Sequence, residues 1–267
     1  MQPLLSLLQL DLSDLLIALL VFSRIGGMVL AMPGITTHVS WRLRIVITLS
    51  ITAVLVPGLV DTESASVAGL LGESSWTMLI VNMAAAAGRE LILGMIIGGV
   101  VQLLVSGVQL AGEMIATVSG IPLGGIEGSG EQGTPALSRL IGLLAVAVMM
   151  LAGGHRALVS ALLDSFSGVA PGDASINQPL IELIIDQLTK GMGAGLRVAA
   201  PVCLTLIATQ LLVGLISRTM PQINIFAVGL NLNVLAMLVV TALTIGSAGL
   251  IFQEELSLAT EQLHGLW

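Results

Sequence analysis

The chain has 267 residues, of which 55% are hydrophobic and only 9% are charged, and its mean hydropathy is +1.03. Soluble globular domains carry about 25% charged residues, so this composition excludes a solvated globular surface and indicates an integral membrane protein. The formal net charge of −7 is spread over termini and loops, and the few arginines form no basic patch, which makes nucleic acid a poor candidate partner.

The first apolar segments have the length of membrane helices, since about 20 residues cross a bilayer. Residues 15–32 form one such segment, and residues 43–60 form the next. The second is expected to end near Pro57, which is followed by a glycine, because that pair stops a helix. Together the two segments predict a helical hairpin, followed by a polar, acidic connection over residues 61–75.

The rest of the chain alternates long apolar segments with short polar or glycine-rich ones. The predicted helices cover residues 76–119, 137–152, 157–166, 180–216 and 226–252; the first and fourth are overlong, and the fourth contains Pro201. The connections between them are a glycine-rich loop over 120–133, a turn over 153–156 and a polar segment over 171–177. An acidic, amphipathic tail follows the last helix. Apolar periodicity thus predicts about six or seven helices. We expect an all-α integral membrane protein with one membrane domain over residues 1–267, in which several helices are broken by glycine or proline and packed as hairpins.

One face of the overlong helix at 76–119 carries polar or small residues at every third or fourth position. These residues are Glu90, Gly94, Gly98, Gln102, Ser106, Gln109 and Glu113. A polar stripe is costly in lipid, so it should face protein or water, with the glycines letting a neighbouring backbone approach. The stripe is either a pore or subunit-contact surface or an internal packing seam.

Charged residues within apolar runs are candidate functional sites by default. They are Arg24, Arg89, Glu90, Glu113 and Arg197. Arg89 and Glu90 are expected near a helix end, and Glu113 is expected to bond a neighbouring loop or helix. A proton relay would need several carboxylates on facing helices, whereas this chain offers mainly Glu113 at depth.

The chemistry of enzymes and metal sites finds little support in the sequence. The three histidines lie far apart and form no pattern with metal-ligand spacing, so no zinc site is expected. Residues 128–133 read GxGxxG, but no βαβ unit surrounds them. We expect no catalytic residues, no cofactor and no metal; the glycine-rich loop is either a mobile channel mouth or a flexible surface connection.

Two stretches resemble the FliR family of flagellar export-gate subunits. The first is Val108-Gln109-Leu110-Ala111-Gly112-Glu113-Met114-Ile115, followed by the glycine-rich loop, a Pro-Ala-Leu-Ser-Arg sequence at 135–139 and Gly154-His155. The second is Pro221-Gln222-Ile223-Asn224-Ile225-Phe226-Ala227-Val228-Gly229. With Phe22-Ser23-Arg24 near the start, the resemblance spans most of the chain.

Two positions depart from the family pattern. The family usually has a proline after the residue that matches Gly229, whereas this chain continues Leu230-Asn231-Leu232-Asn233. The loop after Glu113 usually reads closer to Gly-Leu-x-Phe-Ala, and here it reads Ser119-Gly120-Ile121-Pro122-Leu123-Gly124-Gly125.

The resemblance implies a subunit that assembles with FliP-like and FliQ-like subunits, and with other membrane proteins of the flagellar export apparatus, into a helical channel for unfolded flagellar proteins. It places the chain in membrane lipid, in the bacterial inner membrane at the flagellar basal body, as a conduit and not a catalyst. The implied plug residues are Gln109, Gly112, Glu113, Ser119, Gly120, Ile121, Pro122, Gly124 and Gly125. Structural or subunit packing is expected of Arg89, Glu90, Gly94, Gly98, Gln102, Pro221, Gln222, Asn224, Phe226 and Gly229.

Three other functions remain open. The homologous subunit of a virulence injectisome shares the implied fold and mechanism, although the wording of both motifs resembles the flagellar branch. A secondary transporter would bind a small solute between broken helices, as the break at Pro201 and the polar stripe suggest, and inverted repeats would favour it. A membrane enzyme would require a cluster of catalytic groups, which the sequence lacks.

Overall fold

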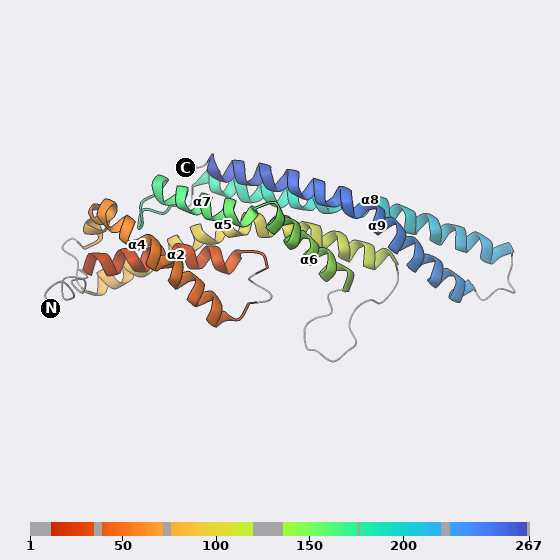
Figure 1. Cartoon of the computed structure of the whole chain (residues 1–267), viewed down its shortest axis with the longest axis horizontal. Coiled ribbons are helices and arrows are strands. Elements are labelled where there is room, and N and C mark those ends of the chain that lie inside the picture. The colour runs from red at the N-terminus through yellow and green to blue at the C-terminus, as the bar shows by residue number, and fades with distance from the viewer. Residues whose placement is uncertain are drawn as a thin grey trace. The chain divides into compact units, whose positions relative to one another are not determined.

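The computed structural model describes residues 12–34, 39–71, 76–119, 136–175, 177–219 and 225–265. Within these ranges every regular element is an α-helix, which confirms the predicted all-α class (Figure 1). The helices are α2 (Leu12–Ala31), α4 (Trp41–Leu71), α5 (Trp76–Ser119), α6 (Ala136–Leu151), α7 (Gly154–Gly168), α8 (Gln178–Thr219) and α9 (Ile225–His264).

Four of the described helices are long and apolar enough to cross a bilayer, and the count rises to six if each of two bent helix pairs forms one span. The four are α2, α4, α5 and α8. At 1.5 Å per residue the 44 residues of α5 extend over about 66 Å. That length is about twice the roughly 30 Å hydrocarbon core of a bilayer, so part of α5 must lie beyond one simple crossing.

Several predicted helix ends are wrong. Helix α4 continues through Pro57 to Leu71, so most of the expected acidic connection is helical. Pro57 is exposed, which leaves room for the distortion that its ring causes, and in an apolar environment the backbone must satisfy its own hydrogen bonds. The expected turn at 153–156 is also shorter: Gly153 has a φ of 78°, and α7 begins at the next residue. Helix α9 runs past Phe252 to His264, with a bend of 47° between its parts Asn231–Thr244 and Gly246–Leu263.

Two compact units contain the described helices. The first unit comprises Met1–Gln102, His155–Ile185 and Thr260–Trp267, and the second comprises Leu103–Gly154 and Asp186–Ala259. Long helices are shared between them, because α5 and α8 each contribute residues to both. One membrane domain over residues 1–267 stays a prediction.

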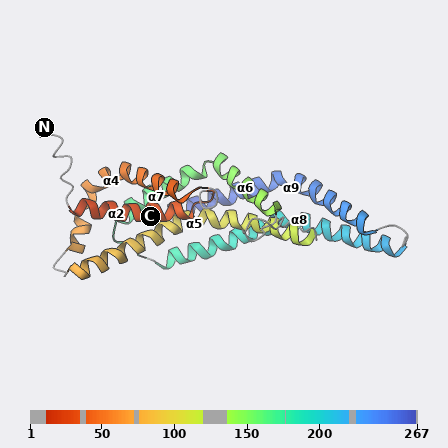
Figure 2. The ribbon, with the colours of Figure 1, turned by 90° about the horizontal axis from the view of Figure 1, so that it is seen from below.

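In the first unit, α2 packs against α4 and α5 (Figures 1 and 2). Its core side chains are buried, among them Ile17, Leu20, Ile25 and Met28 of α2 and Ile97 of α5. Glycines bring the two backbones together: a Cβ placed on Gly27 would overlap the Leu91 carbonyl, and one on Gly94 would overlap the Arg24 carbonyl. The α2/α5 contact is thus a close backbone approach that any larger residue would open.

In the second unit, α8 and α9 run side by side in both views (Figures 1 and 2). A core cluster joins them to α5 and contains Ala111, Ile115, Val198, Ala199, Val202, Leu206 and Met237. The α5/α8 contact also depends on glycine, because a Cβ on Gly107 would overlap Gly191, and one on Gly195 would overlap Gly107. Cys203 is partly buried against this cluster.

Candidate functional site

A buried ion pair lies at the centre of the first unit. Arg24 Nε lies 2.5 Å from Glu90 Oε2, and Arg24 Nη2 lies 3.1 Å from Glu90 Oε1. Both side chains are fully buried. Helix α5 runs from Trp76 to Ser119, so Glu90 lies well inside it. The expectation that Arg89 and Glu90 lie near a helix end is wrong. The paired fork geometry satisfies both charges where water does not reach.

The remaining polar atoms of the pair bind the end of α7 and the turn after it. Arg24 Nη1 donates to the carbonyls of Ser165 and Val169 at 2.9 and 3.1 Å, and the backbone N–H of Gly172 donates to Glu90 Oε1 at 2.8 Å. The Arg24 guanidinium also lies 4.3 Å above the Phe166 ring centroid. A cation at the C-terminus of a helix satisfies carbonyls that lack partners within the helix. One ion pair thus joins α2, α5, α7 and the 169–172 turn.

The polar stripe of α5 has different surroundings along its length. Gly94 and Gly98 lie against the α2 backbone beside the ion pair, and Gln102 is half-buried. Further along, Ser106 is exposed, while a Cβ on Gly112 would lie 2.5 Å from the Ser138 Cα of α6. In the first unit, Gly94 and Gly98 thus belong to an internal contact between α5 and α2.

The end of α5 is held by two amide side chains from the second unit. Gln210 Nε2 of α8 donates to the carbonyl of Val118 at 2.6 Å, and Asn233 Nδ2 of α9 donates to the carbonyl of Ser119 at 3.2 Å. The last four carbonyls of a helix have no partner within it. Side chains from two neighbouring helices therefore cap α5 where the 120–135 segment begins.

The other end of that segment is also attached to α5. Ser138, in the first turn of α6, donates from Oγ to the Gln109 carbonyl at 3.0 Å. Gly142 packs on the Gln109 side chain, since a Cβ there would lie 2.6 Å from Gln109 Cγ. Three hydrogen bonds and two close glycine approaches thus attach the end of α5 and the start of α6, which flank residues 120–135, within the second unit.

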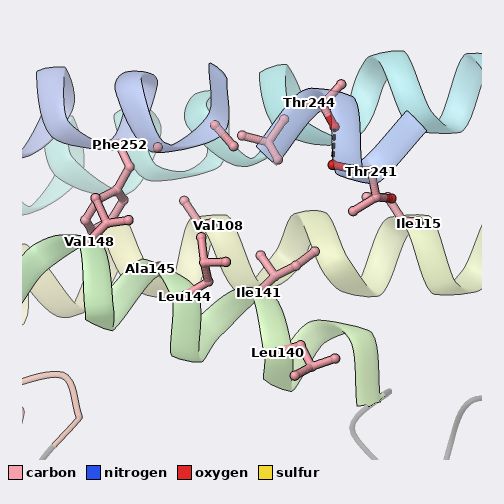
Figure 3. Close-up of a pocket in the computed structure, with 13 residues that line it drawn as sticks. Val108, Ile115, Leu140, Ile141, Leu144, Ala145, Val148, Thr241, Thr244 and Phe252 are labelled. Atoms are coloured by element: carbon pink, nitrogen blue, oxygen red, sulfur yellow. Dashed lines mark hydrogen bonds between the residues drawn. The ribbon is translucent and has the colours of Figure 1, made fainter. Parts of the chain in front are cut away.

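A cavity of about 290 Å³ lies beside these contacts, between α5, α6, α8 and α9 (Figure 3). Its lining is apolar apart from Thr241 and Thr244. The Thr244 hydroxyl donates to the carbonyls of Val240 and Thr241 at 2.9 and 3.2 Å, so its O–H is already used in hydrogen bonds within α9. The cavity therefore suits an apolar side chain or hydrocarbon better than a polar solute.

The other predicted site residues fall into three groups. Glu113 is half-buried, and its carboxylate has no hydrogen-bond or ion-pair partner among the described residues; Arg89 is exposed. A Cβ on Gly229 would lie 3.0 Å from Val213 Cγ1. Outside the described residues are Gly120, Ile121, Pro122, Gly124, Gly125, Pro221, Gln222 and Asn224, and the side chain of Phe226 is not described either.

Sequence reasoning missed the partners that complete these contacts. Gln210 and Asn233 were not singled out as ligands of α5, although Asn233 belongs to the stretch that departs from the family pattern. Arg197 of α8 and Glu255 of α9 form a further ion pair at 3.3 Å, in which the arginine side chain is 66% exposed. An unpaired charge in an apolar run signals that a partner exists, but its spacing does not identify which one.

Within the described ranges, no group of three His, Cys, Asp or Glu side chains could hold a metal ion. The described polar clusters instead satisfy carbonyls and opposite charges of this chain. Their chemistry is that of helix attachment: ion pairing, capping and close backbone packing.

The chain is similar to known bacterial export proteins. It matches the family model described as bacterial export proteins, family 1, over residues 15–259. A flagellar biosynthetic protein FliR of Caulobacter vibrioides is 25% identical over 240 residues, which cover 89% of this chain and 92% of that protein. The FliR proteins of Escherichia coli and Bacillus subtilis are 26% and 23% identical, over 55% and 67% of this chain and 57% and 71% of their own lengths. This chain belongs to the bacterial export protein family 1, whose model matches it along most of its length.

Proposed function

We propose that the chain is a subunit of the flagellar type III protein-export gate, where it helps to form and close the channel for unfolded flagellar proteins. Membership of an export family over residues 15–259 supports this function, as do relatives named flagellar biosynthetic protein FliR. The flagellar names of these relatives favour the flagellar system over an injectisome. Family membership favours protein export over small-solute transport or catalysis.

The observation that carries the proposal is the uncovered apolar surface of helices too long for one bilayer. Helix α8 has 42 residues and so extends over about 63 Å, yet only 22% of its most apolar stretch is buried within the chain. Lipid can cover about 30 Å of such a helix. The remaining apolar surface must meet protein, and FliP-like and FliQ-like subunits are the partners we propose for it.

The exposed apolar residues of α8 follow helical spacing. Ile181, Ile185, Leu188, Met192 and Leu196 recur every three or four positions, and each is about half exposed. Such a stripe on a long helix is a surface for packing against another helix. Subunit contact along α8 would therefore bury a continuous apolar face.

Closure of the channel is proposed for the stretch from Gln109 to Gly125. Its described part, Gln109 to Ser119, is the last section of α5, which Gln210, Asn233 and Ser138 hold in place. A loop that closes a channel needs firm attachment at both ends and freedom between them. The attachments of α5 and α6 supply the first condition.

The proposed setting is the bacterial inner membrane at the flagellar basal body. The test is co-expression of a tagged chain with FliP-like and FliQ-like subunits, followed by purification in mild detergent and by motility assays in a strain that lacks the native gene. A discrete complex and restored motility are expected. A folded, monodisperse monomer that ignores those subunits would contradict the gate assignment.

Shortening the 120–133 segment tests the closure role within the same system. Loss of the segment should raise passive leakage of ions through an assembled complex, because a channel without its closure conducts. Replacement of the segment by an equally long glycine-serine sequence is the matched control for loop length. Unchanged permeability in a complex that assembles without the segment would refute the plug assignment.

A further inference from the structure

A groove of about 450 Å³ in the first unit lies between α2, α4 and α5. Sites for small ligands have volumes of about 300 to 1,000 Å³. Leu19, Phe22, Val29 and Leu30 of α2, Ile45 of α4 and Leu91 of α5 supply most of its apolar wall. The body of any occupant must therefore be apolar.

The two hydroxyl groups in the wall are already satisfied within the protein. Ser23 Oγ donates to the Ala87 carbonyl at 2.6 Å, and Thr48 Oγ1 donates to the Arg44 carbonyl at 2.8 Å. Neither hydroxyl needs a polar ligand. The wall thus presents hydrocarbon, and polar recognition is confined to the groove's mouth.

At the mouth, Trp41 and Arg44 line the groove where α4 begins. The Arg44 Nε donates to the Val39 carbonyl at 3.1 Å, which keeps its side chain at the start of the helix. Trp41 is 67% exposed. Among the described residues, no aspartate or glutamate lines the groove, so the charge that these residues give it is positive in a chain whose net charge is −7.

This order of side chains matches the profile of one bilayer leaflet. Tryptophan and basic residues favour the headgroup level, and apolar residues favour the acyl region. Along α2 the groove extends from Leu19 to Leu30, about 16 Å of helix, which is roughly half of the 30 Å hydrocarbon core. Only 11% of the apolar stretch Trp41–Leu59 is buried, so α4 faces outward beside the groove.

We propose that this groove binds one acyl chain of an anionic phospholipid, with the headgroup phosphate beside Arg44 and Trp41 at headgroup level. Charge complementarity selects an anionic lipid over a zwitterionic one, and each arginine near an anionic headgroup contributes about fivefold in affinity. The site goes beyond the export function and does not depend on it. Lipid bound here would fill the space between α2 and α4.

Fluorescence of Trp41 provides a direct test. In the full-length chain with Trp76→Phe and Trp267→Phe, Trp41 is the only tryptophan. Two samples are compared, and in both the chain is placed in phosphatidylcholine nanodiscs that contain the same small fraction of a lipid with brominated acyl chains. The brominated lipid is phosphatidylglycerol in one sample and phosphatidylcholine in the other. Brominated phosphatidylglycerol should quench Trp41 several-fold more strongly. Equal quenching by the two lipids would overturn the proposal.

Substitutions at the mouth and in the wall separate charge from shape. Arg44→Gln should lower the preference for phosphatidylglycerol about fivefold, with Arg218→Gln at the end of α8 as the charge control. A Cβ on Gly26 would meet only Thr48 Cγ2, at 3.7 Å, whereas Gly58 has open space. Gly26→Leu should therefore fill the groove and reduce quenching by both lipids, and Gly58→Leu should not.

Two further results would also overturn the proposal. One is unchanged lipid preference in the Arg44→Gln chain, which remains informative even where Gly26→Leu prevents folding. The other comes from a photo-cross-linking residue at Leu30 in cells. Lipid adducts are expected there, and adducts to another protein in their place would assign the groove to a partner subunit.

Discussion

The side-chain amide of Asn233 donates a hydrogen bond to the main-chain oxygen of Ser119, with 3.2 Å between Nδ2 and O. The two residues are 114 positions apart in the sequence. Gln210 makes the equivalent contact with Val118 from α8. Together these amides connect the last turn of α5 to the α8/α9 pair, within the stretch from Gln109 to Gly125 to which we assign channel closure.

Replacing these amides should loosen the end of α5. Asn233→Leu removes the amide that donates to the Ser119 carbonyl, at a cost of about 1 to 3 kcal/mol, and Gln210→Leu should add to the effect. We expect raised ion leakage through the assembled complex in membrane vesicles. Asn231→Leu is the matched control, because Asn231 is exposed on the same helix. Leakage equal to that of the control would contradict the capping role.

The Arg24–Glu90 pair should be sensitive to the loss of either partner. Arg24→Met or Glu90→Met alone leaves a buried charge unpaired, which costs about 3 to 5 kcal/mol. The double substitution should cost less than the two single changes added together, because no lone charge remains. Thermal unfolding of the purified chain in detergent measures these differences.

Arg89→Met provides the control for the ion pair, since Arg89 is the exposed neighbour of Glu90. It should leave the unfolding temperature nearly unchanged. Strict additivity of the two single substitutions would show that Arg24 and Glu90 act independently.

Two glycines of α5 should respond in opposite ways to alanine. Gly94→Ala forces a methyl group into the Arg24 carbonyl and must push α2 away, whereas Gly99 has nothing within 4 Å of a new Cβ. Gly99→Ala should stabilise the helix by up to about 1 kcal/mol through helix propensity. Thermal unfolding in detergent compares the two variants, and similar unfolding temperatures would contradict the close approach.

The second motif is expected to act in assembly. Asn224 directly precedes α9, where an asparagine cap contributes about 0.5 to 2 kcal/mol. The sequence predicts Phe226 to be an apolar anchor, and truncation of a buried phenylalanine costs about 3 to 5 kcal/mol, so Phe226→Ala should reduce recovery of the complex more than Asn224→Ala. Complex yield and motility are measured for each variant. Normal assembly with an altered set of exported proteins would instead make the segment a recognition site.

Composition and apolar length alone predicted the class of the protein and most of its helices. Segments of about 20 or more apolar residues can satisfy their backbone in lipid only as helices, so apolar length located α2, α5 and α8 with little ambiguity. Proline and glycine predicted the helix ends less reliably. Pro57 did not end α4. Its ring has room on the surface of the helix, and in an apolar surrounding without water the neighbouring backbone keeps its helical hydrogen bonds, so the proline distorts the helix without breaking it.

Only the tertiary structure decided which polar groups meet. The sequence identified Arg24 and Glu90 as charges in apolar runs, but 66 residues separate them, and helical spacing relates only residues within one helix. The same holds for Asn233 and Ser119. A buried charge or an uncapped carbonyl requires a partner, and the identity of that partner depends on how distant helices pack.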